Sequence, residues 1–236
     1  NFDEGTLLFC TAKGIVKRTP LADYRRPKAG GIIAIGLDEG DRLIDVAVCG
    51  DADEIVLGSR SGKALRIKVS AIRTTGRPSR GVRGLKLLGD DEVCGMAIVS
   101  EECSLLTVSE KGYGKRTSFA EYPQRRRGGQ GVINIRTTSR NGAVVAIRAV
   151  SDEDDVIYIT TKGQVVRTPV DGISQIGRAT QGVRLLKLKE DDRVASVARI
   201  LPEEEDGEED APEEALPDGQ AEPADDGADG DPEENP

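Results

Sequence analysis

Residues 111–116 read Lys-Gly-Tyr-Gly-Lys-Arg, and the outline of this segment occurs four times in the chain. Each copy has a Lys-Gly or Ser-Gly pair, and an arginine follows four residues after the glycine. The pairs are Lys13-Gly14, Ser61-Gly62, Lys111-Gly112 and Lys162-Gly163, with glycines 48, 50 and 51 residues apart. A spacing of this length is typical of repeat proteins in which each copy forms one small sheet, such as a propeller blade.

Each repeat contains four short runs rich in β-branched residues and bounded by Gly, Pro or Asp, which predicts four strands. The first two runs are joined by the Lys/Ser-Gly turn, where glycine supplies the positive φ of a tight hairpin. A second glycine, at Gly31, Gly81, Gly131 or Gly182, precedes the third run. The expected third strands are Gly31–Gly36, Val82–Leu87, Val132–Arg136 and Val183–Leu188. We therefore expect an all-β, propeller-like fold with four four-stranded blades.

Charge divides the chain into a basic body and an acidic tail. Residues 202–236 contain 17 Asp and Glu and no Lys or Arg, whereas residues 1–201 carry 33 basic and 25 acidic side chains, a net charge of +8. The tail has no aromatic residue and too few apolar ones to offset its ordering entropy, so we predict that it is disordered. The body, residues 1–201, is expected to be one domain with repeats at 5–50, 54–100, 104–151 and 155–201.

Composition argues against several classes of active site. The chain has no His, and its four Cys contain no CxxC pair, which excludes His-dependent nucleophilic catalysis and favours buried, reduced thiols in a cytosolic protein. No stretch resembles a membrane span or a signal peptide. The acidic pairs Asp90-Asp91 and Asp154-Asp155 lie in or beside predicted turns, so we interpret them as solvated turn residues and not as a hydrolytic pair.

The loops between the second and third runs are rich in Arg and Lys. The candidate binding residues are Arg25, Arg26, Lys28, Arg77, Arg80, Arg83, Arg125, Arg126, Arg127, Gly128, Gly129 and Arg178. A guanidinium group can donate to two phosphate oxygens at once, and glycines let the backbone approach a phosphate closely. Loops at one position of successive blades lie along one edge, so we predict a track for duplex DNA that depends little on base sequence. The seven aromatic residues form no cluster that would stack single-stranded bases.

Several motifs, in order and at repeat spacing, resemble the C-terminal domain of the DNA gyrase A subunit. They are Lys17-Arg18-Thr19, Arg80-Gly81-Val82-Arg83-Gly84, Gly112-Tyr113-Gly114-Lys115-Arg116-Thr117, Glu121-Tyr122-Pro123 and Thr180-Gln181-Gly182-Val183. The resemblance covers residues 2–201 and implies a β-pinwheel, in which neighbouring blades exchange strands. It also implies bending and wrapping of duplex DNA around a basic rim, in support of ATP-dependent negative supercoiling by a type II topoisomerase.

In that family the A and B subunits work together in an A2B2 heterotetramer, and the ATP and Mg2+ sites and the catalytic tyrosine belong to other domains. The resemblance therefore implies that this chain is non-catalytic, holds no cofactor or metal of its own, and is cytoplasmic and associated with the nucleoid.

The family's box motif, Gln-Arg-Arg-Gly-Gly-Lys-Gly, has a modified counterpart here. Gln124–Gly131 reads Gln-Arg-Arg-Arg-Gly-Gly-Gln-Gly, with one extra Arg and with Gln130 in place of the Lys, and it lies in the third repeat. The family usually has six blades with the box in the first. Because four repeats are visible and the chain starts at Asn1, we expect a fragment that begins inside the domain, with the true box upstream. The alternative is that Gln124–Gly131 itself serves as the box.

Two other functions are compatible with the same residues. The related domain of topoisomerase IV recognises DNA crossings without supercoiling, and a propeller scaffold with basic loops can bind acidic protein partners. The acidic tail suggests a further hypothesis: its carboxylates compete with DNA for the basic rim and so modulate wrapping.

Overall fold

The computed structural model describes residues 2–202, which form fifteen strands and three short 3-10 turns. The first repeat contains β1 (Thr6–Thr11), β2 (Ile15–Pro20) and β3 (Leu43–Cys49). The second contains β4 (Glu54–Ser59), β5 (Lys63–Lys68), β6 (Val82–Arg83) and β7 (Val93–Ile98). The third contains β8 (Ser104–Ser109), β9 (Tyr113–Ser118), β10 (Val132–Ile133) and β11 (Val144–Val150). The fourth contains β12 (Asp155–Thr160), β13 (Val165–Pro169), β14 (Val183–Arg184) and β15 (Val194–Ile200). The 3-10 turns are Leu21–Tyr24, Val69–Ala71 and Phe119–Glu121.

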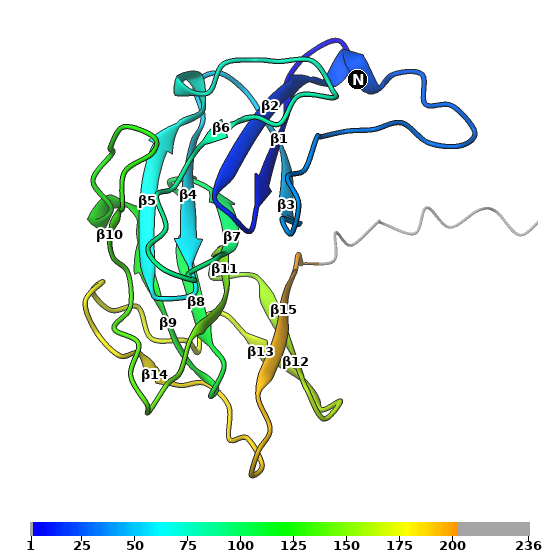
Figure 1. Ribbon diagram of the computed structural model, residues 1–236. Helices are drawn as coiled ribbons and strands as arrows, with labels where there is room; N and C mark the ends of the chain where they lie inside the picture. The colour runs from blue at the N-terminus through cyan, green and yellow to red at the C-terminus, as the bar shows by residue number, and fades with distance from the viewer. Residues whose placement is uncertain (1, 203–236) are drawn as a thin grey trace, which may run out of the picture. The chain divides into compact units, whose positions relative to one another are not determined.

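The strands form four sheets that follow one another along the chain, from β1 at the N-terminal end to β15 at the other (Figure 1). Their strand orders are β3-β1-β2-β6, β10-β5-β4-β7, β11-β8-β9-β14 and β13-β12-β15. The last strand of each repeat lies at one edge of its sheet, and β3 packs against β7, β7 against β11 and β11 against β15. These four strands therefore form the inner side of the row of blades, and the all-β, propeller-like prediction is confirmed.

The third strand of each repeat belongs to the preceding blade. β6 pairs with β2 through Val82–Val16 and Arg83–Ile15, and β10 and β14 pair with β5 and β9 in the same way. This exchange, which the resemblance implies, is confirmed, but the strands are two residues long and not five or six as expected. The ladder stops because the next two N–H groups, of Gly84 and Leu85, both donate to the carbonyl of Gly14 in the hairpin turn.

One expected strand, and one expected strand position in the fourth sheet, are missing from the described residues. Gly31–Gly36 is not a strand, because no earlier blade there offers it a β-strand partner. The fourth sheet has three strands and not four, because no later repeat within residues 2–202 supplies its outer strand. Both differences are consequences of strand exchange at the two ends of a row.

The hydrophobic core lies between adjacent blades. One cluster joins the first two sheets, a second joins the middle pair and a third joins the last pair. β4 and β8 are therefore covered on both faces, so nearly all of their residues are buried, without the alternation of a half-exposed strand. The end blades have an uncovered face, where Val48 is 57% exposed and Val165 is 61% exposed.

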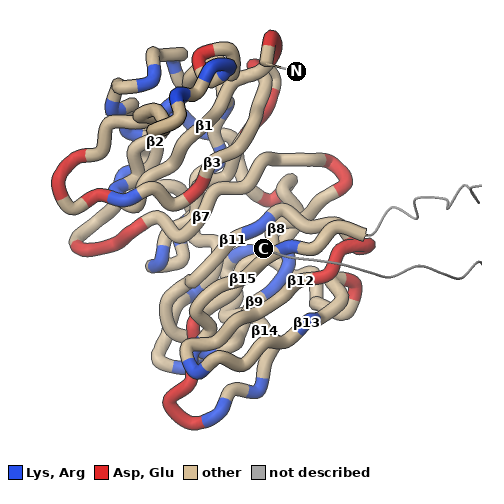
Figure 2. Tube along the Cα trace, turned by 90° about the vertical axis from the view of Figure 1, so that its right-hand side faces the viewer, with Lys and Arg blue, Asp and Glu red and all other residues tan. Residues whose placement is uncertain are grey.

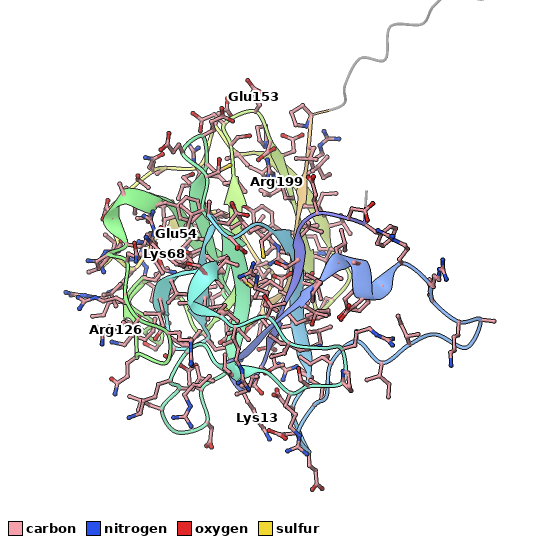
Figure 3. All side chains as sticks on the ribbon, turned by 90° about the horizontal axis from the view of Figure 1, so that it is seen from above. Lys13, Glu54, Lys68, Arg126, Glu153 and Arg199 are labelled. Atoms are coloured by element: carbon pink, nitrogen blue, oxygen red, sulfur yellow. The ribbon has the colours of Figure 1, made fainter. Side chains whose placement is uncertain are left out.

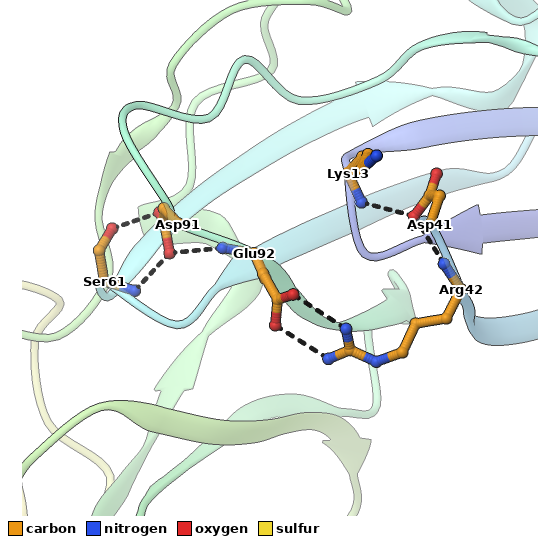
Figure 4. A network of polar contacts seen from close by, with 6 residues as sticks. All are labelled: Lys13, Asp41, Arg42, Ser61, Asp91 and Glu92. Carbon is orange, nitrogen blue, oxygen red and sulfur yellow. Dashed lines mark hydrogen bonds and ion pairs between the residues drawn. The ribbon is translucent and has the colours of Figure 1, made fainter. Parts of the chain in front are cut away.

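Turns at one end of the blades are held by carboxylates (Figure 4). Asp41 accepts hydrogen bonds from the backbone N–H groups of Lys13 (3.0 Å) and Arg42 (2.8 Å). Asp91 makes the equivalent bonds with Ser61 and Glu92 in the second repeat, both at 2.9 Å. Asp41 and Asp91 each cap two turns at once, which confirms Asp91 as a turn residue. Asp154 also accepts from a turn N–H, that of Ser151 (2.6 Å), but its side chain is buried and pairs with Arg199, so the expectation that it is solvated is wrong.

Two further sequence predictions concern the tail and membrane crossing. Residues 203–236, nearly all of the predicted disordered tail, lie outside the described residues. Within residues 2–202, no helix has the length and apolar character needed to cross a bilayer.

Candidate nucleic-acid interface

The long loops between the second and third strands lie on the outer side of the blades. They comprise residues 21–30, 69–81, 119–131 and 170–182, which we call the basic loops. The last three each form a parallel bridge with the preceding blade: Arg18 with Thr74, Arg66 with Gln124 and Arg116 with Gln175. Since β2, β5 and β9 lie opposite the inner strands in their sheets, the basic loops face away from the inner side.

Backbone hydrogen bonds join the second, third and fourth basic loops to equivalent positions in the preceding repeat. The bonds run from Gly36 N to Ser79 O (3.1 Å), from Lys86 N to Gly129 O (2.9 Å) and from Arg136 N to Thr180 O (2.8 Å). They occupy equivalent positions in successive repeats. The second, third and fourth basic loops therefore form one continuous strip along the outer side, whereas the first, whose residues 25–30 are exposed, extends away from the first blade (Figure 1).

Most of the predicted binding residues are accessible on or beside the basic loops. Exposed side chains are those of Arg25, Arg26, Lys28, Arg80, Arg83, Arg125, Arg126 and Arg127, whereas Arg77, Arg178, Gly128 and Gly129 are half-buried. Arg25 pairs with Asp3, and Arg80 pairs with Asp38 at 2.7 Å. Figure 3 shows Arg126 at the periphery of the molecule. The structure thus places all twelve predicted residues in or directly beside the basic loops.

Acidic residues are distributed differently. Figure 2 shows many of the Asp and Glu positions in turns at the ends of strands. Within the basic loops, residues 69–81 contain three arginines and no acidic residue, and residues 119–131 contain three arginines and one glutamate. The second loop, with a net charge of +3, is therefore the most positive, the first and third each carry +2, and the fourth is neutral.

The third basic loop carries the box-like sequence and lies over an open hollow. The hollow has a volume of about 430 Å³ and is lined by Leu65, Arg125, Arg126 and the backbone of 129–131. Gly128, with φ of +77°, donates its N–H to the carbonyl of Gly84 in the preceding repeat. The loop therefore presents two guanidinium groups beside a concave, glycine-lined surface.

Two of the predicted binding arginines also tie their loop to the exchanged strand of the preceding repeat. Nη1 of Arg127 donates to the carbonyl of Arg83 (3.3 Å), and Nη1 of Arg178 donates to the carbonyl of Ile133 (3.0 Å). Positions 83 and 133 are equivalent in consecutive repeats, so one interaction is repeated. Arg178 also lies over the ring of Tyr122, 5.9 Å from its centroid. Part of the positive charge of the strip therefore maintains its shape.

Two buried lysines hold basic loops from beneath, and they were not among the residues predicted from the sequence. Nζ of Lys17 donates to the carbonyls of Ala34 and Arg77, both at 2.5 Å. Nζ of Lys115, which is fully buried, donates to the carbonyls of Gly177 and Arg178, both at 2.6 Å. Burial lowers the pKa of each ammonium to about 8.

The signal for these lysines was present in the sequence. Lys17 and Lys115 are the first residues of the two Lys-Arg-Thr motifs, whereas Leu65 and Val166 occupy the same position in the other repeats. Their burial depends on the loop of the next repeat, which folds over them only in the assembled row.

The arginine that recurs four residues after each turn glycine is structural in the first three blades. Nη1 of Arg66 donates to the carbonyl of Phe119 (2.9 Å), and Nε of Arg116 donates to that of Ile173 (2.8 Å). Carboxylates pair with these guanidinium groups: Asp51 with Arg18, Glu54 with Arg66, and Asp152 with Arg116. In the last blade, where no later loop within residues 2–202 covers it, the side chain of Arg167 is 60% exposed.

A family model described as DNA gyrase C-terminal domain, beta-propeller, matches the chain in four segments, residues 5–50, 53–100, 104–151 and 154–200. The chain belongs to this family. The four matches correspond to the four sequence repeats, so the DNA gyrase C-terminal domain family accounts for the body of the chain.

Similar curated proteins are gyrase A subunits. The chain is 46% identical to the DNA gyrase A subunit of Salmonella typhimurium over 211 residues, which are 89% of this chain and 24% of that protein. It is 42% identical to the DNA gyrase A subunit of Pseudomonas aeruginosa over 207 residues, 88% of this chain and 22% of that protein. The chain thus spans about a quarter of the length of the curated relatives it matches.

Solved structures of two related domains have the same fold. The C-terminal domain of DNA topoisomerase IV superimposes with a TM-score of 0.80 at 25% identity, over 85% of this chain and 64% of that chain. The DNA gyrase A C-terminal domain superimposes with a TM-score of 0.77 at 28% identity, over 84% of this chain and 67% of that chain.

Proposed function

We propose that this chain binds duplex DNA along the strip of basic loops and bends it, as the wrapping domain of a gyrase-type A subunit. The observation that supports the proposal is the row of backbone hydrogen bonds that fixes the second, third and fourth basic loops against the preceding repeats, so that their exposed arginines share one continuous surface. A flexible polyanion that follows such a surface contacts several blades in succession, and DNA that does so must bend.

The chemistry of the strip favours phosphates over bases. The exposed groups are guanidinium and ammonium groups on loops, and the described residues offer no helix or long β-ribbon that would enter a groove. Binding is therefore insensitive to base sequence and sensitive to salt. If about six phosphates are neutralised, log K falls with log[salt] at a slope of about −5.

At the level of the whole protein, the family membership supports a wider proposal. The chain would act within an A2B2 assembly of A and B subunits, in the cytoplasm and on the nucleoid, and its bent DNA would feed ATP-dependent negative supercoiling. ATP and Mg2+ would bind in other parts of that assembly, and the chain itself would contribute DNA geometry and no catalytic group.

A topoisomerase IV type of function is the second candidate, because the topoisomerase IV domain is as similar in fold as the gyrase domain. In that case the same strip would hold a DNA crossing without wrapping the DNA in one handedness. The two candidates agree on duplex binding and differ in the topology of the bound DNA.

The binding proposal is tested by titrating the full chain with a duplex of random sequence at several salt concentrations. We expect Arg125→Gln/Arg126→Gln to weaken binding and to make the salt slope shallower by about 2, because two phosphate contacts are removed. The matched control is Arg42→Gln/Arg193→Gln, two arginines with side chains 55% and 57% exposed that pair with Glu92 and Glu110 away from the basic loops.

Three outcomes decide the binding proposal. A shallower slope in the loop variant alone supports the strip as the binding surface. An equal effect in the control pair contradicts it, because general charge then explains binding. Absence of duplex binding at low salt, together with salt-sensitive binding of an acidic protein, rejects it in favour of the scaffold function.

A further inference from the structure

The turn between the last two strands of the third repeat differs in charge from its counterparts. The other three repeats have acidic residues there, at 38–41, 90–92 and 190–192, whereas the third reads Ser139-Arg140-Asn141-Gly142. Asn141 keeps the turn closed by accepting a hydrogen bond from the backbone N–H of Thr138 (2.8 Å). One blade therefore presents a cation at a position where the others present carboxylates.

Arg140 lies on a tyrosine that a second arginine also covers. The guanidinium carbon of Arg140 is 4.9 Å from the ring centroid of Tyr113, and that of Arg184 is 5.6 Å from it. Nη2 of Arg184 also donates to the Tyr113 hydroxyl at 3.1 Å. The ring thus holds two guanidinium groups near each other without a carboxylate between them.

Both arginines are exposed, and neither forms an ion pair with a carboxylate in the part of the chain that the structure describes. Two further cations lie close in the sequence and fold: Lys111 donates through Nζ to the carbonyl of Ser139 (2.5 Å), and Arg136 precedes the turn. Two unpaired, exposed guanidinium groups held side by side have an unmet capacity to donate to oxygen atoms of an anion.

The cluster directly adjoins the strip of basic loops. Nδ2 of Asn141 donates to the carbonyl of Gln181 (3.0 Å) at the end of the fourth basic loop. Arg184 pairs with Tyr113 in the same register in which Arg83 pairs with Ile15. Arg184 is therefore the counterpart of Arg83, two blades further on. Because Arg83 was predicted to bind, the alignment of the repeats in the sequence already pointed to Arg184.

We propose that Arg140 and Arg184, held on the ring of Tyr113, form an additional anion site that binds a phosphate group of the DNA backbone where the duplex leaves the fourth basic loop. This inference rests on the proposed function for the source of the phosphate, but the site itself requires only an anion. The site would extend the path of the bound duplex from the basic loops to the turn at residues 139–142 of the third blade.

A phosphate fits this site better than a base. The Tyr113 side chain is buried, with the residue 8% exposed, and both guanidinium groups lie against its ring, so no ring face is free to stack on a base. The planar guanidinium forks instead suit the paired oxygens of a phosphodiester.

The first test measures duplex affinity and its salt dependence for the full chain with Arg140→Gln/Arg184→Gln. We expect roughly tenfold weaker binding at low salt and a salt slope shallower by about 2. The control is Arg42→Gln alone, because the partner of Arg193, Glu110, lies against Gly142 in the turn that carries Arg140. An unchanged slope overturns the proposal. Arg140→Gln alone, in an exposed turn, is measured beside the double variant, and a slope shallower by about 1 is expected even if the double variant folds poorly.

The second test observes the site without DNA, through the ionisation of Tyr113. Hydrogen bonds from Arg140 and then Arg184 lower the pKa of Tyr113, whereas burial raises the pKa of the other three tyrosines, so the first tyrosinate to form on raising the pH is that of Tyr113. Its near-ultraviolet absorbance is followed with and without inorganic pyrophosphate.

We expect pyrophosphate to raise the titration midpoint of Tyr113, because an anion that engages both guanidinium groups weakens their hold on the phenolate. A midpoint that does not move overturns the site. If the chain binds no duplex but pyrophosphate still raises the midpoint, the function proposal fails and the anion site stands, so the two failures are distinguishable.

Discussion

At the scale of single residues, positive side chains in this protein serve two purposes. Those of Arg125 and Arg126 project from a loop, whereas Lys17 and Lys115 are buried and donate to loop carbonyls. Sequence composition counts all of them as positive charge and cannot separate them. The distinction depends on burial beneath a loop that comes about 60 residues later in the chain.

Lys115→Met is expected to weaken duplex binding without changing its salt slope. The buried ammonium cannot reach a phosphate, but its loss leaves the carbonyls of Gly177 and Arg178 without their donor and loosens the fourth basic loop. Equilibrium titration at several salt concentrations measures both quantities. The matched control is Leu65→Met, because Leu65 is the equivalent residue in the second blade and is already apolar. A shallower salt slope in Lys115→Met would contradict the prediction, since it would indicate that Lys115 contacts a phosphate directly.

The same substitution predicts a pH dependence of stability. Burial lowers the pKa of folded Lys115 to about 8, whereas the ordinary value of 10.5 applies to the unfolded chain. Between these values the unfolded state binds more protons, so this residue's contribution to the free energy of unfolding rises with pH and is lost as the pH falls through 8. The difference in free energy of unfolding, wild type minus Lys115→Met, should therefore increase from pH 8 to 10.5 in denaturant titrations. A difference that decreases over this range contradicts the burial of a charged Lys115.

At the scale of elements, local pattern predicted the strands that pair within a repeat and failed where the partner lies in another repeat. The first, second and last strands of every repeat are present as predicted, because they pair with one another through local turns. The third strands shorten to two residues because the turn of the preceding blade captures the chain after them. Gly31–Gly36 has the same pattern but no partner sheet within the described residues.

The hairpin turns give an element-scale prediction through Gly62. At its φ of +84° a Cβ atom would lie 2.2 Å from the carbonyl oxygen of Ile135, in the strand segment that the next repeat contributes. We expect Gly62→Ala to destabilise the fold by roughly 2–4 kcal/mol, from backbone strain and from displacement of the exchanged segment. Thermal or denaturant unfolding measures the change.

Gly163→Ala is the control for that experiment. Gly163 has nearly the same φ, +80°, in the turn of the last blade, but no atom lies within 4 Å of its added Cβ. We therefore expect Gly163→Ala to lower the free energy of unfolding by only about 1–2 kcal/mol, the cost of an alanine at positive φ. Equal losses in the two variants would show that the exchanged segment does not press on the turn.

At the scale of the whole molecule, the blades are linked twice: by apolar clusters between adjacent sheets and by the strip of basic loops on the outer side. The repeat spacing predicted the row of blades, and the common position of the loops predicted that their charges share one side. Sequence could not show that Arg127 and Arg178 tie their loops to the exchanged strands of the preceding repeat, because those contacts join residues 44 and 45 positions apart. It also missed Arg140 and Arg184, which become neighbours only through the ring of Tyr113.

The acidic tail gives a second whole-molecule prediction, which rests on charge alone. If its 17 carboxylates compete with DNA for the strip, deletion of residues 203–236 will raise duplex affinity at low salt and have less effect at high salt, where screening weakens both interactions. A chain of full length with its tail Asp and Glu replaced by Asn and Gln should behave like the deletion. Equal affinity of all three proteins at low and moderate salt contradicts the competition.

The central claim is that the strip wraps duplex DNA around the row of blades with a single handedness. A topology measurement tests this claim most directly. A nicked DNA circle is ligated in the presence of increasing amounts of the chain, the protein is removed, and the linking number is read on a gel. We predict a dose-dependent shift of a single sign, which Arg125→Gln/Arg126→Gln reduces and Arg42→Gln/Arg193→Gln does not. Tight binding with no change in linking number would contradict wrapping and leave a strip that holds DNA without turning it.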